Sequence, residues 1–126
     1  MATADMGGGR QRLSKDRLDQ FRGLQYGMFI HFGMTTFHGI TLDGNAQRII
    51  AYDRAPVELY KPTALDVEQW VRVASEAGMK YLVLTAKHHT GFCLWPSAQT
   101  AYHVGNSADK TDVIAAFVKA CRKYGM

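Results

Sequence analysis

Two short apolar runs, each followed by the pattern of an amphipathic helix, restrict what this chain can fold into. The first run is Gly-Met-Phe-Ile-His-Phe-Gly at 27–33, and the second is Lys-Tyr-Leu-Val-Leu-Thr-Ala at 80–86. Runs that are apolar at successive positions are typical of strands buried on both faces of a parallel sheet. Helices are expected at 66–77 and 112–124, so the alternation predicts an α/β fold with parallel strands and right-handed crossovers.

Capping residues predict where each helix begins and ends. Ser14 is suited to cap a short first helix that runs through Phe21, with Gly23 as its stop. Asp66 is suited to cap the second helix, and Gln69 three residues later completes a capping-box pattern. The other expected boundaries are Gly78 after the second helix, Thr111 or Asp112 before the last helix, and Gly125 after it.

The chain is short for the fold that this pattern favours. A closed (β/α)8 barrel takes roughly 250 residues, whereas this sequence has 126. Two strands are too few for a parallel sheet, so we expect residues 13–126 to be the N-terminal part of such a barrel, truncated before its third strand. Residues 1–12, with three consecutive glycines, are expected to be a flexible lead. Residues 34–62 show no sustained period and are expected to be mostly loop, of a length that usually serves a site.

Composition excludes several classes of protein. With 47% hydrophobic and 21% charged residues, the chain is not of the intrinsically disordered class. No run of about 18 apolar residues is present, so no transmembrane helix is expected. The first ten residues lack the apolar segment of a secretory signal, so the sequence as given is consistent with a cytoplasmic location but does not establish one, and no membrane partner is expected. The net charge is only +4 and most basic residues are scattered, so no nucleic-acid partner is expected.

The chemically informative residues are histidines at the ends of the two apolar runs. His88 and His89 follow Lys87 where the second run ends, and His31 lies near the end of the first run. Ligand-binding groups in parallel sheets lie at the carboxyl ends of the strands, so these histidines can face one pocket. Imidazoles can donate and accept hydrogen bonds, which suits a polyhydroxylated ligand, and Gly91 would let the backbone turn close to it.

The histidines also admit other interpretations. His88 and His89 are consistent with two surface residues of a loop, and His31 is consistent with a hydrogen-bonded core residue. A metal site is a third interpretation, but adjacent side chains on an extended backbone point to opposite sides, and that spacing fits zinc poorly. His38 and His103 lie in loops and are expected at the surface.

Aromatic residues accompany the histidines, whereas a pair of carboxylates does not. Phe92 and Trp95 can form a wall for the apolar face of a sugar ring, although Trp95 is equally suited to packing. Glycoside hydrolysis typically needs two carboxylates about 5–10 Å apart. Asp43 and Asp53 could reach a site, but nothing in the sequence pairs them. No nucleophile elbow, phosphate loop or dinucleotide fingerprint is present.

Three segments of the chain carry motifs that match a known family of enzymes. They are the 27–33 run, Leu-Asp-Val-Glu-Gln-Trp at 65–70, and the 77–97 segment that includes Lys-His-His-Thr-Gly-Phe-Cys-Leu-Trp-Pro-Ser. With these motifs, the chain resembles the N-terminal catalytic region of the α-L-fucosidases of glycoside hydrolase family 29. The resemblance extends over residues 23–126 and implies a (β/α)8-like domain that cleaves terminal α-linked L-fucose with retention of configuration.

The resemblance also implies roles for individual residues. His31, His88 and His89 would contact hydroxyls of a fucosylated glycan or glycoside, and Trp95 would lie near the pocket. The family's aspartate nucleophile and its acid/base carboxylate are expected beyond Met126, so no catalytic residue is assigned and the chain alone is expected to be inactive. No metal and no organic cofactor are implied.

The chain departs from the family's pattern at two places. Residues 34–62 contain no Glu-Trp pair, which many members have in this loop, and Thr90 stands where an aspartate is usual, a change that can shift substrate preference. One alternative function is a non-catalytic sugar-binding or assembly fragment that completes its barrel with another chain, or self-associates, through an open sheet edge. A metal-dependent hydrolase that uses the histidines is a further alternative.

Overall fold

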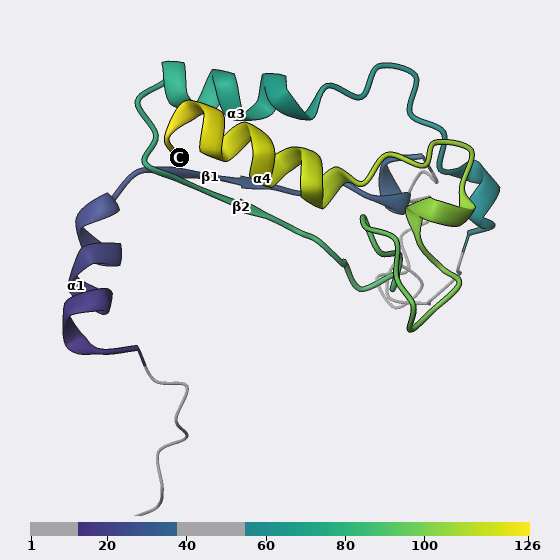
Figure 1. The fold of residues 1–126 in the computed structure, drawn as a ribbon, viewed down its shortest axis with the longest axis horizontal. Helices are drawn as coiled ribbons and strands as arrows, with labels where there is room; N and C mark the ends of the chain where they lie inside the picture. The colour runs from purple at the N-terminus through teal and green to yellow at the C-terminus, as the bar shows by residue number, and fades with distance from the viewer. Residues whose placement is uncertain (1–12, 38–54) are drawn as a thin grey trace, which may run out of the picture.

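The computed structural model describes residues 13–37 and 55–126. The two later α-helices pack over two parallel strands, and the first α-helix projects away from them (Figure 1). In chain order, the elements are α1 (Lys15–Leu24), β1 (Gly27–Ile30), the 3-10 helices Met34–Thr36 and Val57–Leu59, α3 (Val67–Glu76), β2 (Tyr81–Leu84), the 3-10 helix Val104–Asn106 and α4 (Val113–Tyr124). This order confirms the predicted α/β alternation. The predicted lead at 1–12 and residues 38–54 of the predicted loop lie outside the described residues.

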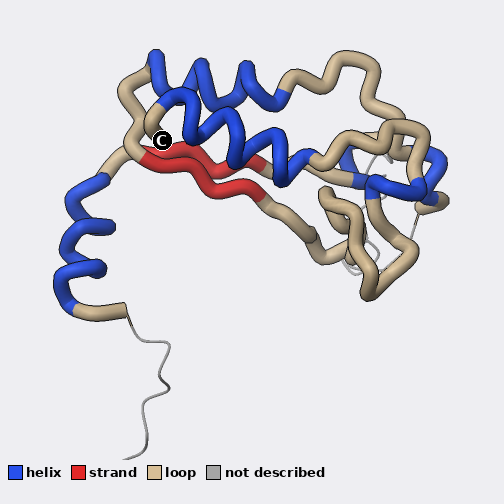
Figure 2. The backbone as a smooth tube through the Cα atoms, in the orientation of Figure 1, coloured by secondary structure: helices blue, strands red, loops and turns tan. Residues whose placement is uncertain are grey.

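The two strands pair in parallel, as predicted. Gly27 of β1 lies opposite Tyr81 of β2, and Ile30 lies opposite Leu84, so both strands end at the same edge of the sheet. Among the described residues, each strand has four residues and only one strand neighbour. The expectation that both strand faces are buried is wrong here, because α3 and α4 cover one face while Phe29 and Val83 on the other are 59% and 42% exposed (Figure 2).

The predicted N-caps are all present. Ser14 Oγ accepts a hydrogen bond from the backbone N–H of Arg17, at 3.3 Å. Asp66 and Asp112 cap α3 and α4 in the same way, each through its Oδ1 and at 2.9 Å. Gly78 and Gly125 follow α3 and α4 with φ of 77° and 66°, a region in which glycine carries no steric penalty.

The first helix ends later than the sequence predicted. Gly23 does not stop α1 but lies inside it, and Gln25, with φ of 54°, is the residue at which the helix ends. A glycine near an exposed helix end lowers helix stability by only about 1 kcal/mol, so the helix can continue through Gly23 to the next residue. The chain then enters the sheet at Tyr26, whose carbonyl accepts a hydrogen bond from Lys80 N–H at 2.8 Å.

The best-buried side chains lie under the loops that follow the strands, not between the strands and helices alone. Phe32, Trp70 and Tyr102 are partly buried and pack against this cluster. The cluster includes residues from the predicted 34–62 loop, so that loop contributes packing as well as connection. Its buried members are Met34, Ala55, Tyr60, Val67, Phe92, Leu94, Val104 and Val113.

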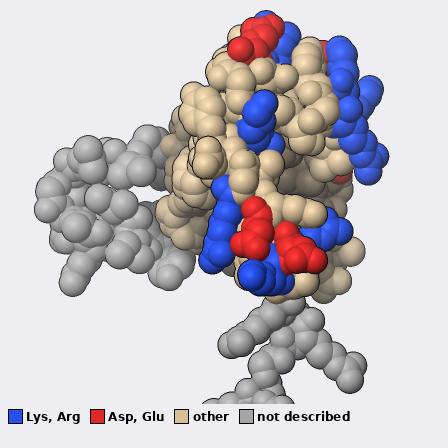
Figure 3. All heavy atoms as spheres, turned by 90° about the vertical axis from the view of Figure 1, so that its left-hand side faces the viewer, with Lys and Arg blue, Asp and Glu red and all other residues tan. Residues whose placement is uncertain are grey.

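Charged side chains are spread over the surface. In Figure 3, Lys and Arg lie in several separate groups with Asp and Glu among them. Arg22 pairs with Asp19 and Arg72 with Glu76, both at 3.2 Å and both exposed. Exposed pairs of this kind contribute little to stability, because solvent screens them.

Candidate functional site

Three histidine rings come together at the carboxyl ends of the strands. His31 follows β1 directly, and His88 lies four residues after β2. The His31 and His88 ring centroids are 5.5 Å apart, and those of His88 and His89 are 4.1 Å apart, both pairs meeting edge to face. We call His31, His88 and His89 the histidine cluster.

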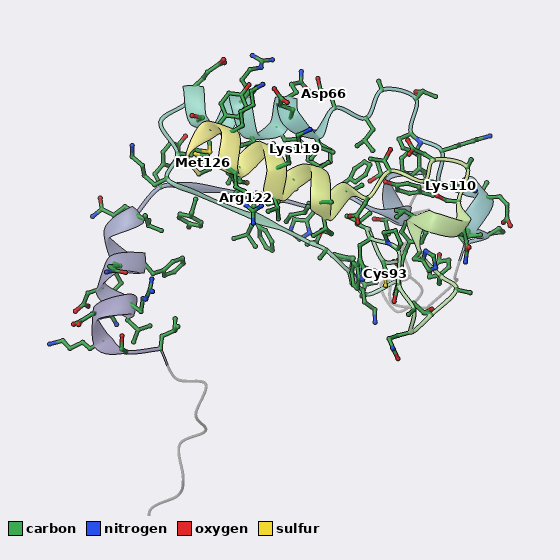
Figure 4. All side chains as sticks on the ribbon, viewed as in Figure 1. Asp66, Cys93, Lys110, Lys119, Arg122 and Met126 are labelled. Atoms are coloured by element: carbon green, nitrogen blue, oxygen red, sulfur yellow. The ribbon has the colours of Figure 1, made fainter. Side chains whose placement is uncertain are left out.

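A tight turn explains why His88 and His89 lie together. Lys87 and Cys93 form an antiparallel bridge, and Gly91 N–H donates to the His88 carbonyl at 2.9 Å. Gly91 has φ of 82°, so it supplies the left-handed backbone that this turn needs. The backbone here is therefore not extended, and the expectation that the two imidazoles point to opposite sides is wrong. Figure 4 shows Cys93, at the base of this turn, in the loops that lie away from α1.

Thr85 connects the two strand ends beside the histidine cluster, and the sequence analysis missed it. Its Oγ1 donates to the Ile30 carbonyl at 3.3 Å and accepts from Phe32 N–H at 3.4 Å. These two residues flank His31, so Thr85 holds the backbone of His31 against the segment that leads to His88. A hydroxyl at the end of an apolar strand was the available signal, because a part-buried hydroxyl usually needs partners.

Burial and charge both favour the neutral form of His88. Partial burial lowers the pKa of the His88 imidazole, and the neighbouring His89 and His31 rings lower it further by disfavouring a second positive charge. Its Nδ1 is enclosed and has no hydrogen-bond partner among the described residues. A neutral imidazole has one donor and one acceptor nitrogen, so His88 is suited to hydroxyl groups, which can meet either role.

Phe29, not Phe92, is the aromatic side chain beside the cluster. The Phe29 and His31 ring centroids are 4.4 Å apart, as expected for residues two apart on one strand face. Phe92 is only 2% exposed and packs against Tyr60 and Tyr102, at 4.8 and 5.2 Å. The expectation that Phe92 forms a wall for a sugar ring is therefore wrong, because a core residue cannot contact a ligand.

Trp95 lies in a different environment from the three histidines. It lines a groove along α4, together with Ile114, Ala115 and Val118. Within the described parts of the chain, no aromatic ring contact joins Trp95 to the histidine cluster. Contact between Trp95 and a ligand stays a prediction.

The other histidines and acids named from the sequence are outside this cluster. His103 is half-buried and has a structural role, because its Nδ1 accepts from Gly105 N–H at 3.0 Å and caps the Val104–Asn106 helix. This partial exposure does not contradict the expectation of a surface residue, but the sequence did not predict the capping role. His38, Asp43 and Asp53 lie outside the described residues.

Within residues 13–37 and 55–126, no group of three or more His, Cys, Asp or Glu side chains is arranged to hold a metal ion. No helix in the same ranges has the length and apolar character needed to span a membrane.

Comparison with known proteins identifies relatives of the whole described fold. A family profile described as Alpha-L-fucosidase matches residues 9–126. Alpha-L-fucosidase 1 of Arabidopsis thaliana is 37% identical over 102 residues, covering 79% of this chain and 19% of the relative. Tissue alpha-L-fucosidase of Mus musculus is 33% identical over 95 residues, covering 61% of this chain and 21% of the relative. The chain thus spans about a fifth of the length of these relatives.

Solved structures that resemble the chain also belong to glycoside hydrolase family 29. An alpha-L-fucosidase of glycoside hydrolase family 29 from Bacteroides thetaiotaomicron superposes with a TM-score of 0.75 at 32% identity, covering 91% of this chain and 29% of that one. A family 29 member from an unknown rumen bacterium superposes with a TM-score of 0.75 at 35% identity, covering 90% and 19%. The described fold therefore matches the N-terminal part of a family 29 (β/α)8 catalytic domain.

Proposed function

The chain belongs to the alpha-L-fucosidase family of glycoside hydrolase family 29, and from that premise we propose that it forms the fucose-binding corner of an α-L-fucosidase. In this role, the histidine cluster binds sugar hydroxyls and leaves bond cleavage to carboxylates on other segments of the fold. The proposal concerns His31, His88 and His89, which lie on two adjacent strand ends.

The proximity of the three rings is the observation that carries this proposal. Centroid distances of 5.5 and 4.1 Å place several ring nitrogens within reach of one small polar ligand. Neighbouring hydroxyls of a hexose are separated by a similarly short distance, so one sugar can use more than one ring. The lowered pKa of His88 supports the same role, because the accessible nitrogen of a neutral ring can either donate to a hydroxyl or accept from one, according to the tautomer.

Each group in the site has a separate task. The enclosed Nδ1 of His88 leaves Nε2 as the nitrogen that meets the sugar. Thr85 keeps His31 at the distance from His88 that a shared ligand requires. L-Fucose carries a methyl group in place of the hydroxymethyl group of a hexose, and the exposed Phe29 ring beside His31 offers an apolar surface for such a group.

We propose that the complete enzyme cleaves its substrate by the retaining mechanism of the family. A structure of the Bacteroides thetaiotaomicron enzyme is described as a trapped covalent intermediate with 2-fluoro-fucosyl fluoride. A covalent glycosyl-enzyme intermediate belongs to the retaining mechanism, in which one carboxylate attacks the sugar and another acts as acid and then base. We assign neither role to a carboxylate of this chain and propose that both reactive carboxylates lie on other segments of the fold.

Binding of L-fucose to the full chain tests the proposal. NMR spectra of the histidine ring protons would be followed while L-fucose is added, with its mirror image, D-fucose, as the matched ligand. The signals of His31, His88 and His89 should move with L-fucose and much less with D-fucose. His103 serves as an internal control, because its Nδ1 is already occupied by Gly105 N–H and its signals should stay in place.

A variant completes this test. His88→Phe keeps a ring of similar size but removes both nitrogens, so the shifts of His31 and His89 should fall to the level seen with D-fucose. The proposal fails if L-fucose moves none of the three histidines, or if it moves His103 as much as it moves them.

Turnover provides an independent measurement. The chain alone should not release the aryl group of an aryl α-L-fucoside above the rate of the buffer, because both reactive carboxylates are proposed to be elsewhere. Clear turnover would contradict that placement of the nucleophile and would leave the histidine assignment to be judged by the NMR experiment.

A further inference from the structure

Tyr60 is a fully buried tyrosine at the centre of a group of aromatic rings. Its side chain is 0% exposed and is the largest of the fully buried side chains in the described residues. Its ring centroid lies 6.0 Å from that of Phe32, 5.2 Å from that of Phe37 and 4.8 Å from that of Phe92. Aromatic rings at these separations attract one another beyond the effect of burial. Tyr60 thus contacts three rings from a segment that contains none of the three clustered histidines.

Two of these three rings belong to the two segments that carry the histidine cluster. Phe32 follows His31 directly in the sequence. Phe92 follows Gly91, the last residue of the turn that carries the other two histidines. The Tyr60 ring therefore contacts one aromatic neighbour on each side of the candidate site, and any displacement of this ring would be felt on both sides.

The backbone around Tyr60 is anchored by residues outside the histidine cluster. Tyr60 ends the 3-10 helix Val57–Leu59, and its N–H donates to the Val57 carbonyl at 3.1 Å. Tyr102 Oη donates to the Ala55 carbonyl at 2.9 Å, just before this helix. The helix lies beside the second 3-10 helix, Val104–Asn106 (Figure 1). The Tyr60 ring is therefore held from its own side and can support the rings that it contacts.

The ring of Tyr60, and not its hydroxyl, makes these contacts. Its Oη is enclosed and has no hydrogen-bond partner among the described residues. Burial raises the pKa of the Tyr60 hydroxyl, and the negative charge of Asp109 raises it further, so both favour the neutral hydroxyl. A buried hydroxyl without a partner lowers stability. A phenylalanine at position 60 would keep the ring contacts without that loss of stability.

We propose that Tyr60 is a positioning residue for the histidine cluster. Its ring supports the two phenylalanines at a fixed separation, and so holds His31 and His88 at the distance that one shared ligand requires. Thr85 joins the same two segments through hydrogen bonds to the backbone, whereas Tyr60 joins them through side chains. The consequence for sugar binding rests on the proposed function, but the effect on the distance between the histidine rings does not.

The geometry of the cluster makes it sensitive to such support. The ring centroids of His31 and His88 are 5.5 Å apart. His31 is exposed and follows a strand of only four residues, so the position of its backbone depends on the residues beside it. A displacement of about 1 Å in a positioned group can lower function by orders of magnitude. Packing of Phe32 on Tyr60 is suited to prevent a displacement of that size.

The simpler interpretation is that Tyr60 only stabilises the core. Loss of a core side chain lowers stability wherever it lies, so unfolding measurements alone do not separate the two interpretations. Val71 of α3 provides a matched control, because it is also 0% exposed but lies outside the cluster of buried loop residues. Val71→Ala removes core contacts while leaving the rings around Tyr60 in place.

Three variants of the full 126-residue chain test the proposal: Tyr60→Leu, Tyr60→Phe and Val71→Ala. NMR contacts between the ring protons of His31 and His88 would be measured at a temperature at which all of the variants are folded. Tyr60→Leu should weaken these contacts several-fold, whereas Tyr60→Phe and Val71→Ala should keep them. Tyr60→Met, which fills more of the space, takes the place of Tyr60→Leu if the leucine variant does not fold.

Two further measurements report on the site and not on stability. In Tyr60→Leu, His31 should lie farther from His88, so the pKa of His88 should rise toward its ordinary value. The affinity for L-fucose should fall by on the order of tenfold, because the two rings no longer meet one ligand together. Tyr60→Phe should match the natural chain in both measurements.

Three results would overturn the proposal. If Tyr60→Leu keeps the contacts between the histidine rings at their natural strength, Tyr60 is a core residue and no more. If Val71→Ala weakens the contacts equally, they follow overall stability. If Tyr60→Phe weakens them as much as Tyr60→Leu, the hydroxyl and not the ring is responsible. The ring contacts are measured without sugar, so they decide the role of Tyr60 even if L-fucose does not bind to the histidine cluster.

Discussion

The loops that follow the two strands and the open face of the sheet contain similar aromatic residues in opposite environments. We call the region formed by these loops the loop end of the molecule. Phe92 at the loop end is 2% exposed and is surrounded by Tyr60 and Tyr102. Phe29 on the sheet face is 59% exposed, although it is flanked by equally apolar neighbours in the sequence. One region has a closed core made from its own loops, and the other shows a strand face without a cover.

This difference suggests how a candidate site can be well formed in an open sheet. The turn that carries His88 and His89 is built on Lys87–Cys93 and leads directly into the buried Phe92 and Leu94. Its geometry therefore depends on the loop core. The His31 side of the site depends on β1 and on the two hydrogen bonds of Thr85.

The largest effect should come from removing the buried ring. Phe92→Ala should lower the free energy of unfolding by about 3–5 kcal/mol, because it removes apolar contacts and leaves a cavity. Phe29→Ala should lower it by about 1 kcal/mol or less, since that ring is mostly in water already. Urea unfolding of both variants measures the two values. Equal losses would show that the two regions do not differ as described.

A smaller effect is expected where the two regions meet, at Thr85. Thr85→Val keeps the shape but removes both hydrogen bonds, so it should cost about 1–2 kcal/mol of stability. It should also weaken the NMR contacts between the His31 and His88 rings. Thr85→Ser restores the hydroxyl and should recover those ring contacts. If Thr85→Val leaves the ring contacts unchanged, Thr85 does not position His31.

The smallest effect should appear as a dependence on pH. The pKa of His88 is lowered in the folded chain, so the unfolded chain, with an ordinary histidine pKa of about 6.5, binds a proton more readily. The stability contribution of His88 is therefore present above that ordinary value and is lost as the pH falls through the folded pKa. Urea midpoints measured from pH 7.5 down to pH 5 should fall more steeply for the natural chain than for His88→Asn. If the urea midpoints of the two proteins fall in parallel with pH, His88 does not cause the loss of stability at low pH.

Local sequence signals predicted the secondary structure well where the cause was local. Asp66 and Asp112 cap the helices that follow them, since an N-cap needs only a side-chain oxygen and the backbone N–H three residues later. The prediction that α1 stops at Gly23 was wrong, because an exposed helix end tolerates a glycine. The start of β1, and not the glycine, limits how far the helix can extend.

The geometry of the candidate site was harder to predict, because it depends on contacts between residues that are far apart in the sequence. The histidines were identified from their positions at the strand ends, but the contact between adjacent rings depends on a turn that pairs Lys87 with Cys93. The hydroxyl of Thr85 at the end of an apolar strand was a local signal, but the groups that it bonds to lie more than fifty residues away and were decided by the pairing of the strands. Phe92 and Trp95 carry similar sequence signals, and only packing separates the core ring from the groove-lining one.

The amino-acid sequence by itself determined the alternating strands and helices, their caps, their parallel order and the family, because periodicity, capping and motifs act over a few residues. Tertiary structure decided which imidazoles touch, which phenylalanine is buried and which face of α4 is left open. Those outcomes follow from pairing and packing between segments that are far apart along the chain, and no local pattern encodes the distances between them.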